Sequence, residues 1–175
     1  VPFMGRGVLL PVLFRLHVPK SSPSKTEQAR AMVNLLARAL SGRRVHVVAD
    51  ALYRGPAWRN LPGNATFTTR LQATAVLYGP PPAPSGKRGH PAWKGPRLGT
   101  PAEIAATTAW RTATLTRYGQ TGQADIADIA CLWWGSLHRT PVRLILIRDL
   151  DARRRFLALV TTDLHTPAEQ IVARY

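Results

Sequence analysis

Residues 43–50, RRVHVVAD, decide how the first half of the chain folds. The run is short, rich in β-branched side chains and closed by a carboxylate, which is typical of a strand. It follows residues 26–40, where apolar side chains recur every three or four positions and predict an amphipathic helix. Ser24 stands at the N-cap position of this helix, and Gly42 stands where a C-terminal glycine cap is expected.

Further strands are expected on both sides of this helix and strand. Residues 8–18, VLLPVLFRLHV, form an apolar, β-rich run that predicts a mostly buried strand, with Pro11 marking a bulge or a sheet edge. After a turn at residues 62–64, residues 67–71, FTTRL, predict another strand. Strand, helix, strand, short helix and strand in this order indicate an α/β fold.

The composition changes at residues 79–100, GPPPAPSGKRGHPAWKGPRLGT, where Pro and Gly dominate. Because no core can be built from such a stretch, we expect an ordered loop or a lid. Beyond it, apolar and alternating runs separated by turns predict an antiparallel meander. Thr166 and Glu169 have the spacing of a capping box, with Pro167 between them, and so predict a final helix from residue 167.

The charge of the chain indicates an anionic partner. Its 175 residues contain 24 Lys and Arg against nine Asp and Glu, a formal net charge of +15. Such a surplus repels itself unless a polyanion screens it. An apolar content of 45% excludes a disordered chain. We therefore expect a folded basic domain.

The same Pro- and Gly-rich segment holds cations interleaved with an aromatic ring. This pattern offers phosphate contacts together with a surface on which a base or sugar can stack. A solvated loop is the alternative, and the net charge favours the binding role. The three arginines at residues 153–155 mark only a hairpin tip and are weaker candidates. The expected nucleic-acid contacts are Lys87, Arg88, Trp93, Lys94 and Arg97.

Several other chemistries lack the residues that they need. Cys131 is the single cysteine, which excludes an intrachain disulfide and a cysteine-built zinc site. The five histidines show no metal-ligand spacing, and neither a P-loop nor a serine nucleophile elbow occurs. No apolar run reaches the roughly 18 residues that a membrane span needs. Zinc hydrolysis, nucleotide binding and acyl transfer are therefore disfavoured.

Asp50 is the most informative carboxylate. It ends the strand at residues 43–50, and open α/β sheets place ligands and metals at the carboxyl ends of central strands. It equally fits a cap for the turn that follows, and the spacing leaves both interpretations open. Asp149 and Asp163 end two later strands at opposite ends of an expected hairpin, so they cannot share one metal. A turn residue and a cap before the last helix are the favoured interpretations of these two.

Residues 47–55, VVADALYRG, resemble the second-aspartate motif of bacterial insertion-sequence transposases of the DDE type, of the IS4 and IS701 kind. The catalytic domain of that family has a ribonuclease-H-like fold. Residues 8–20 resemble the preceding strand region, and residues 65–78 resemble the following strand. Residues 86–101 are similar to a basic Gly/Pro segment of the family, and residues 157–175 to the approach to its glutamate helix. The resemblance spans nearly the whole chain.

The resemblance implies an architecture and two site residues. Asp50 corresponds to one of three metal-binding carboxylates, and Tyr175 matches the tyrosine that opens the signature of the glutamate helix. The other two carboxylates have no counterpart in the sequence, so we expect a central fragment: a truncated ribonuclease-H-like mixed α/β sheet with a β-rich insertion. The implied divisions are a partial core at 1–78, the basic segment at 79–105, the insertion at 106–163 and the start of the glutamate helix at 164–175.

The resemblance also implies an activity. Relatives of this kind cleave DNA and transfer strands at insertion-sequence ends, with Mg²⁺ or Mn²⁺ held by the three carboxylates. With Asp50 alone, the fragment is expected to bind metal weakly and to be inactive by itself. DNA is the implied partner, a homodimer of the complete enzyme is compatible, no membrane partner is expected, and the location is the bacterial cytoplasm at the nucleoid. The alternative is a catalytically inactive nucleic-acid-binding domain derived from a transposase.

Overall fold

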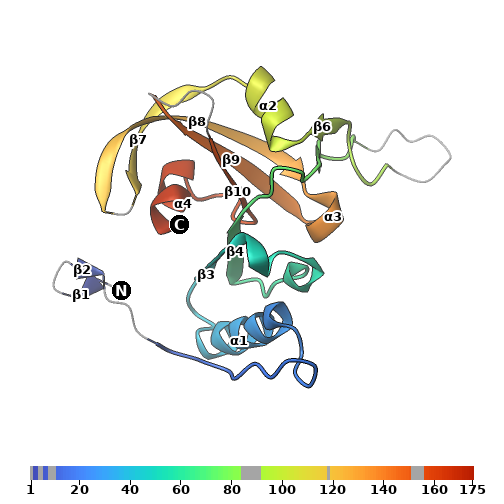
Figure 1. The fold of residues 1–175 in the computed structure, drawn as a ribbon, viewed down its shortest axis with the longest axis vertical. Helices are drawn as coiled ribbons and strands as arrows, with labels where there is room; N and C mark the ends of the chain where they lie inside the picture. Colours follow the sequence, from blue (N-terminus) through green and yellow to red (C-terminus); the bar gives the residue numbers. More distant parts are fainter. Residues whose placement is uncertain (1, 4–5, 8–10, 84–91, 118, 151–155) are drawn as a thin grey trace.

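The structure, a computed structural model, describes residues 2–3, 6–7, 11–83, 92–117, 119–150 and 156–175. It confirms the predicted α/β class, because one mixed sheet of eight strands is flanked by helices (Figure 1). The strands of this sheet are β3 (Val45–Ala49), β4 (Ala65–Arg70), β5 (Leu77–Tyr78), β6 (Arg97–Gly99), β7 (Arg111–Arg117), β8 (Gln120–Leu132), β9 (Pro141–Asp149) and β10 (Leu157–Thr161).

The sheet has the order β3-β4-β10-β9-β8-β5-β6, with β7 paired to β8 outside this path. Strands β3 and β4 are parallel, whereas the remaining pairs are antiparallel. A mixed sheet of this kind is consistent with a ribonuclease-H-like domain. The other elements are the pair β1 (Pro2–Phe3) and β2 (Arg6–Gly7), the helices α1 (Lys25–Ala39), α2 (Pro101–Thr107), α3 (Trp134–Leu137) and α4 (Ala168–Arg174), and the 3₁₀ turns η1 (Ala51–Tyr53) and η2 (Pro56–Trp58).

Helix α1 confirms the helix predicted over residues 26–40. Ser24 is its N-cap and forms a capping box with Glu27, whose pKa is lowered by the hydrogen bonds from Ser24. The predicted glycine cap is wrong, because Leu40 is the C-cap and Gly42 does not adopt the positive φ of a glycine cap. The Asn64 side chain instead donates to three carbonyl groups around this end of the helix, and so ties α1 to the start of β4.

The strand predicted over residues 8–18 is wrong for the part that the structure describes. Residues 11–18 belong to no helix or strand, and the side chains of Phe14 and Leu16 are 94% and 83% exposed. Pro11 has no N–H group to give to a sheet, and an apolar run acquires strand geometry only where a neighbouring strand completes its hydrogen bonds. The run lies along α1 (Figure 1).

The predicted antiparallel meander is confirmed in β7, β8, β9 and β10. Strand β9 lies near its centre and is buried on both faces. Leu144 and Leu146 face the core formed with α1, whereas Ile145 and Ile147 face a second core formed with α4. Because β10 also pairs with β4, the meander and the parallel pair share one sheet. The assignment of residues 106–163 as an insertion stays a prediction.

The Pro- and Gly-rich segment is more ordered than predicted in the part that the structure describes. Residues 97–99 form strand β6, and helix α2 begins at Pro101. Leu98 packs against the core, so the expectation that this stretch contributes nothing to the core is wrong. Residues 84–91 lie outside the described part of the chain.

Helix α4 begins at Ala168, one residue later than predicted, and the capping box is absent. Pro167 is the N-cap, and no side chain bonds to the first turn from that position. The Thr166 hydroxyl donates instead to Asp163 at 2.7 Å, while Glu169 pairs with Arg111 at 2.6 Å. Both members of the expected box are therefore engaged elsewhere. None of the helices in the described ranges has the length and hydropathy of a membrane span.

Candidate active site

Asp50 follows the last residue of β3 and is the N-cap of the turn η1. Its Oδ1 atom accepts a hydrogen bond from the Ala51 N–H at 2.6 Å, so the capping interpretation is confirmed. The cap uses only one of the two carboxylate oxygens. No hydrogen bond to Oδ2 occurs within the described residues, so a second role as a ligand remains compatible with this geometry.

The surroundings of Asp50 hold cations but no ion pair. The side chain is exposed, and no described Lys, Arg or His lies within ion-pair distance of it. Arg54 bonds to the Ala51 carbonyl oxygen at 3.3 Å, and the exposed Arg70 ends the neighbouring strand β4. A free carboxylate near uncompensated arginines is suited to bind a cation beside an anionic chain.

The position of Asp50 in the sheet differs from the expectation in one respect. Its strand β3 pairs only with β4 in the described part of the chain, so Asp50 ends an edge strand and not a central one. Asp50 lines a groove of about 510 Å³ between α1 and β3. The walls of this groove are mainly apolar, with Val12, Met32, Leu36 and Tyr53 among them.

A larger cavity in the described part of the chain lies at the opposite ends of β3 and β4. It measures about 710 Å³ and is lined by Arg44, Asn64, Thr66, Asp163 and His165, among others. Because β3 and β4 are parallel and start at this end, Asp50 at the carboxyl end of β3 does not reach it. The larger cavity therefore does not coincide with Asp50, the candidate metal-binding carboxylate.

The other two candidate carboxylates have structural roles. Asp149 ends β9, is exposed and pairs with Arg117. Asp163 is buried, and it accepts hydrogen bonds from the His165 N–H, the Thr166 N–H and the Thr166 hydroxyl. Burial alone would raise the pKa of Asp163, but these hydrogen bonds and the charge of His46 lower it to about 2. The cap predicted for Asp163 is confirmed.

The residues present do not form a complete metal site. The resemblance to DDE transposases implies a divalent metal, and catalytic Mg²⁺ sites take several oxygen ligands. Over the described ranges, no three side chains of His, Cys, Asp or Glu gather in a group that could hold an ion. Asp50 supplies one carboxylate, and the nearest described strand end, at Arg70, supplies a cation.

The basic segment is described only in part. The expected contacts Lys87 and Arg88 lie outside the described residues, as do residues 153–155. Trp93 is 46% exposed, and Lys94 next to it is half-buried. Their nucleic-acid role stays a prediction.

Arg97 is less available to contact a nucleic acid than the sequence suggests, because it is paired with Glu103. Both terminal nitrogens donate to Glu103, at 3.0 and 3.2 Å. The hydrogen bonds from Arg97 and from Thr100 lower the pKa of Glu103 to about 2, and Glu103 in turn raises the pKa of Arg97. Tyr175, the other residue taken from the resemblance, closes α4 and packs against the second core; its signature role stays a prediction.

A polar cluster that the sequence reasoning missed lies on the sheet face beneath α4. The His46 ring contacts the Thr66 hydroxyl at 2.7 Å and lies 4.0 Å from Asp163. The Thr68 and Thr161 hydroxyls bond to each other at 2.7 Å. Burial and the charge of Arg174 lower the pKa of His46, although Asp163 opposes this.

The signal for this cluster is the alternation of Thr66 and Thr68 in β4, which places both hydroxyls on one face. Residue 46 has the same parity in β3, so its side chain shares that face. The cluster therefore joins three strands and the loop before α4.

Comparison with known families identifies the class of the domain. Residues 5–123 match the family model described as DDE superfamily endonuclease. This range covers more than half of the chain, so the chain belongs to that family. No curated protein and no solved structure matches it. Family membership implies DNA as the substrate of the domain and confirms the DDE part of the resemblance.

Proposed function

We propose that the chain is the central part of the catalytic domain of an insertion-sequence transposase of the IS4 or IS701 kind. In this proposal Asp50 is one of the carboxylates of a Mg²⁺- or Mn²⁺-dependent centre that cleaves DNA and transfers strands at insertion-sequence ends. The complete enzyme acts as a homodimer in the bacterial cytoplasm, on nucleoid DNA. The observation that carries the proposal is the exposed Asp50, free of ion pairs among the described residues, at the carboxyl end of β3 in a chain of the DDE family.

The chemistry requires a carboxylate in this environment. An aspartate that already pairs with arginine has its charge compensated and gains little from a divalent cation. Asp125, Asp128, Asp149 and Asp163 are of that kind, whereas Asp50 is not. The family relationship supports the same residue, because the matched range includes residue 50 and the motif around it.

The test is an Asp50→Asn variant of the full gene product, including any sequence that flanks this chain. The amide preserves the shape and the cap acceptor but removes the negative charge that holds a divalent cation. We expect DNA affinity and the melting temperature to stay within experimental error of the wild type, while metal-dependent cleavage of insertion-end DNA falls below detection. Glu27→Gln is the matched control, because Glu27 is also an exposed capping carboxylate, and it should retain cleavage. Unchanged cleavage by Asp50→Asn would overturn the proposal.

An inactive DNA-binding domain derived from a transposase is the second candidate. It is favoured by one observation, that the described residues hold a single free carboxylate at the proposed centre and no metal-binding group of three. Under this alternative the wild-type protein, tested with its flanking sequence, binds DNA but cleaves none in Mg²⁺ or Mn²⁺. The same assay therefore separates the two candidates.

A further inference from the structure

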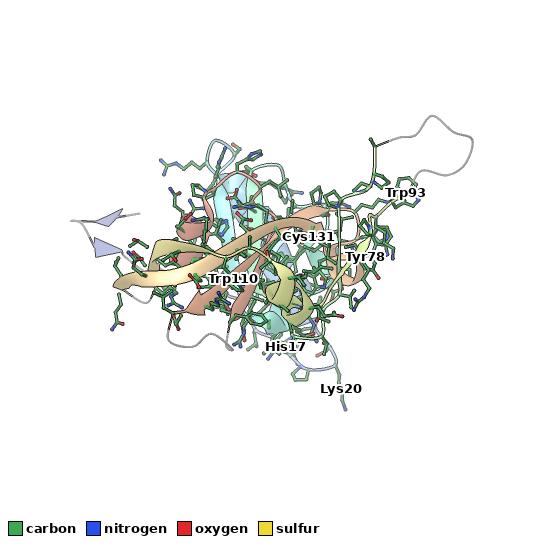
Figure 2. The ribbon with its side chains drawn as sticks, turned by 90° about the horizontal axis from the view of Figure 1, so that it is seen from above. His17, Lys20, Tyr78, Trp93, Trp110 and Cys131 are labelled. Atoms are coloured by element: carbon green, nitrogen blue, oxygen red, sulfur yellow. The ribbon has the colours of Figure 1, made fainter. Side chains whose placement is uncertain are left out.

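A surface of aromatic rings and cations forms where three segments distant in sequence meet. Strand β5 pairs with β8 through Tyr78 and Leu132, which brings Tyr78 close to the residues that follow β8. Figure 2 shows Tyr78 and Trp93 at the same end of the molecule, away from Trp110. The set, called the aromatic-basic platform below, consists of Tyr78, Trp93, Lys94, Trp134, His138 and Arg139.

The cations of the platform lie over the rings. The Lys94 Nζ atom is 3.9 Å from the ring centroid of Tyr78 and 5.3 Å from that of Trp134. The Arg139 guanidinium carbon is 3.2 Å from the centroid of Trp93. The ring of His138 packs against Trp134 in a tilted arrangement, with centroids 4.0 Å apart and an angle of 39° between the ring planes. The platform therefore consists of two adjoining sets of contacts, one around Lys94 and one between Arg139 and Trp93, which are joined through the consecutive residues Trp93 and Lys94.

Backbone contacts hold the platform in place. The Gly95 N–H donates to the Gly79 carbonyl at 2.9 Å, and the Gly79 N–H donates to the Pro96 carbonyl at 2.8 Å. A Cβ atom at Gly95 would lie 2.2 Å from the Pro80 carbonyl oxygen, so only glycine permits this approach. Lys94 and Trp93 directly precede Gly95 and are positioned by it.

His138 is held in a backbone conformation that L-residues rarely adopt, with φ of 56° and ψ of −116°. Such conformations cost free energy and gather at sites where a side chain must point in a fixed direction. Here the strained residue directs its own ring against Trp134 and immediately precedes Arg139. His138 is also the C-cap of α3, so this conformation both ends the helix and fixes the position of the ring in the platform.

Among the described residues, the cations of the platform have no carboxylate partner. Neither Lys94 nor Arg139 forms an ion pair with any described residue. Trp110 provides a contrast, because Arg148 lies 4.1 Å from its ring centroid but also pairs with Asp125 at 3.0 Å. The charge over Trp110 is compensated within the fold, and the charges of the platform are left for an anionic ligand.

Open space adjoins the platform on both sides of Arg139. Arg139 lines the cavity of about 710 Å³ that holds Arg44 and His165, and also a second cavity of about 460 Å³ that holds Pro80 and Arg143. A chain laid across the exposed Trp93 and Arg139 would therefore find room in both directions. It would meet the positive charge of Arg44 in the first cavity, whereas Arg143 in the second is paired with Asp128.

We propose that the aromatic-basic platform binds unpaired bases of a single DNA strand, with Trp93 and Arg139 stacking on bases and Lys94 and Arg139 contacting phosphates. Bases inside a duplex already stack on each other and offer no free face, so exposed rings select unpaired strands. The proposal rests on the proposed function only in taking DNA as the ligand. It assigns the platform a role separate from Asp50 and the cleavage chemistry.

The test compares three ligands by fluorescence anisotropy: an oligothymidylate, an abasic oligonucleotide of the same length and a duplex. The first two carry the same phosphates and differ only in their bases. We expect the wild-type chain to bind the oligothymidylate more tightly than the abasic strand. Trp93→Leu should weaken oligothymidylate binding by roughly 5- to 150-fold and leave the affinities for the abasic strand and the duplex unchanged.

Trp110→Leu is the matched control, since it removes a ring under an arginine outside the platform, and it should change none of the three affinities by more than about twofold. Equal wild-type affinity for the oligothymidylate and the abasic strand would overturn this inference alone, provided that the duplex is bound. Equal losses in the two tryptophan variants would overturn it as well. A wild-type chain that binds none of the three ligands would contradict DNA as the partner, and with it the proposed function.

Discussion

The tetrapeptide Thr-Pro-Ala-Glu occurs twice and shows how one residue outside a motif decides its structure. At residues 100–103 it forms a full capping box that opens α2. At residues 166–169 the same letters form no box, because Asp163 takes the threonine hydroxyl and Arg111 takes the glutamate. Local sequence predicts such a motif only where no long-range partner competes for its side chains.

The capping box at the start of α2 is expected to contribute measurably to the free energy of unfolding. Thr100→Ala removes the acceptor for the Glu103 N–H and should lower the free energy of unfolding by about 1 kcal/mol. The measurement is urea denaturation of the wild type and the variant at neutral pH. Thr74→Ala, at an exposed position, is the control and should stay within about 0.5 kcal/mol of the wild type. A Thr100 variant as stable as this control would contradict the cap.

Asp163 predicts a loss of stability in acid. Its pKa falls from 3.8 to about 2 on folding, so its contribution is complete above about pH 4 and disappears as the pH falls toward 2. The difference corresponds to about 2 kcal/mol. Asp163→Asn should be less stable than the wild type at pH 7, and the gap should close between about pH 4 and pH 2. Melting temperatures of both proteins across this range test it; a constant gap would show that the carboxylate charge is not responsible.

Elements that carry their own pattern were predictable from sequence, and elements that need a distant partner were not. Helix α1 has its period and its Ser24 cap within one segment, and the short apolar run between Pro141 and Asp149, bounded by turns, is typical of a buried strand. Residues 11–18 are equally apolar, yet the structure offers them no strand to pair with. An apolar run indicates that a segment is buried, but it does not indicate which element the segment packs against.

Because strand β9 is buried on both faces, we expect core substitutions on either face to lower the stability of the protein to a similar extent. Leu144 and Ile145 are both fully buried, one in the core with α1 and the other in the core with α4. Alanine at either position should lower the free energy of unfolding by roughly 2 to 5 kcal/mol, since each leaves a cavity in a packed core. Leu150→Ala, 44% exposed just beyond the strand, is the control. Urea titrations in which only one of the two core variants is destabilised would show that the other face is not a real core.

At the scale of the molecule, some residues of the candidate sites could be predicted from local sequence and others could not. Asp50 could be predicted because a strand and its closing carboxylate are contiguous in sequence. The platform could be predicted only at Trp93 and Lys94, because Tyr78 and Trp134 join them through the pairing of β5 with β8. Arg139 reaches Trp93 across 46 positions of sequence, a contact that no local pattern indicates.

The charge of the chain is distributed unevenly around Asp50. Six arginine–carboxylate ion pairs occur among the described residues, and all of them lie between residues 97 and 174. Residues 11–70 carry ten Lys and Arg against two acidic residues, Glu27 and Asp50. The positive surplus that needs an anionic partner is therefore concentrated in the part of the fold that holds Asp50.

This distribution predicts which arginines contact the DNA backbone. The double variant Arg54→Gln, Arg70→Gln removes two exposed cations near Asp50 that pair with no described carboxylate, and it should lower the slope of log K against log salt for duplex binding by about 1.8 in magnitude. The control Arg117→Gln, Arg148→Gln changes the net charge equally but removes arginines that already pair with Asp149 and Asp125. Its slope should stay close to that of the wild type, because arginines held by carboxylates release few counterions from DNA. Equal slopes for both double variants would mean that net charge alone, and not a surface around Asp50, governs the binding.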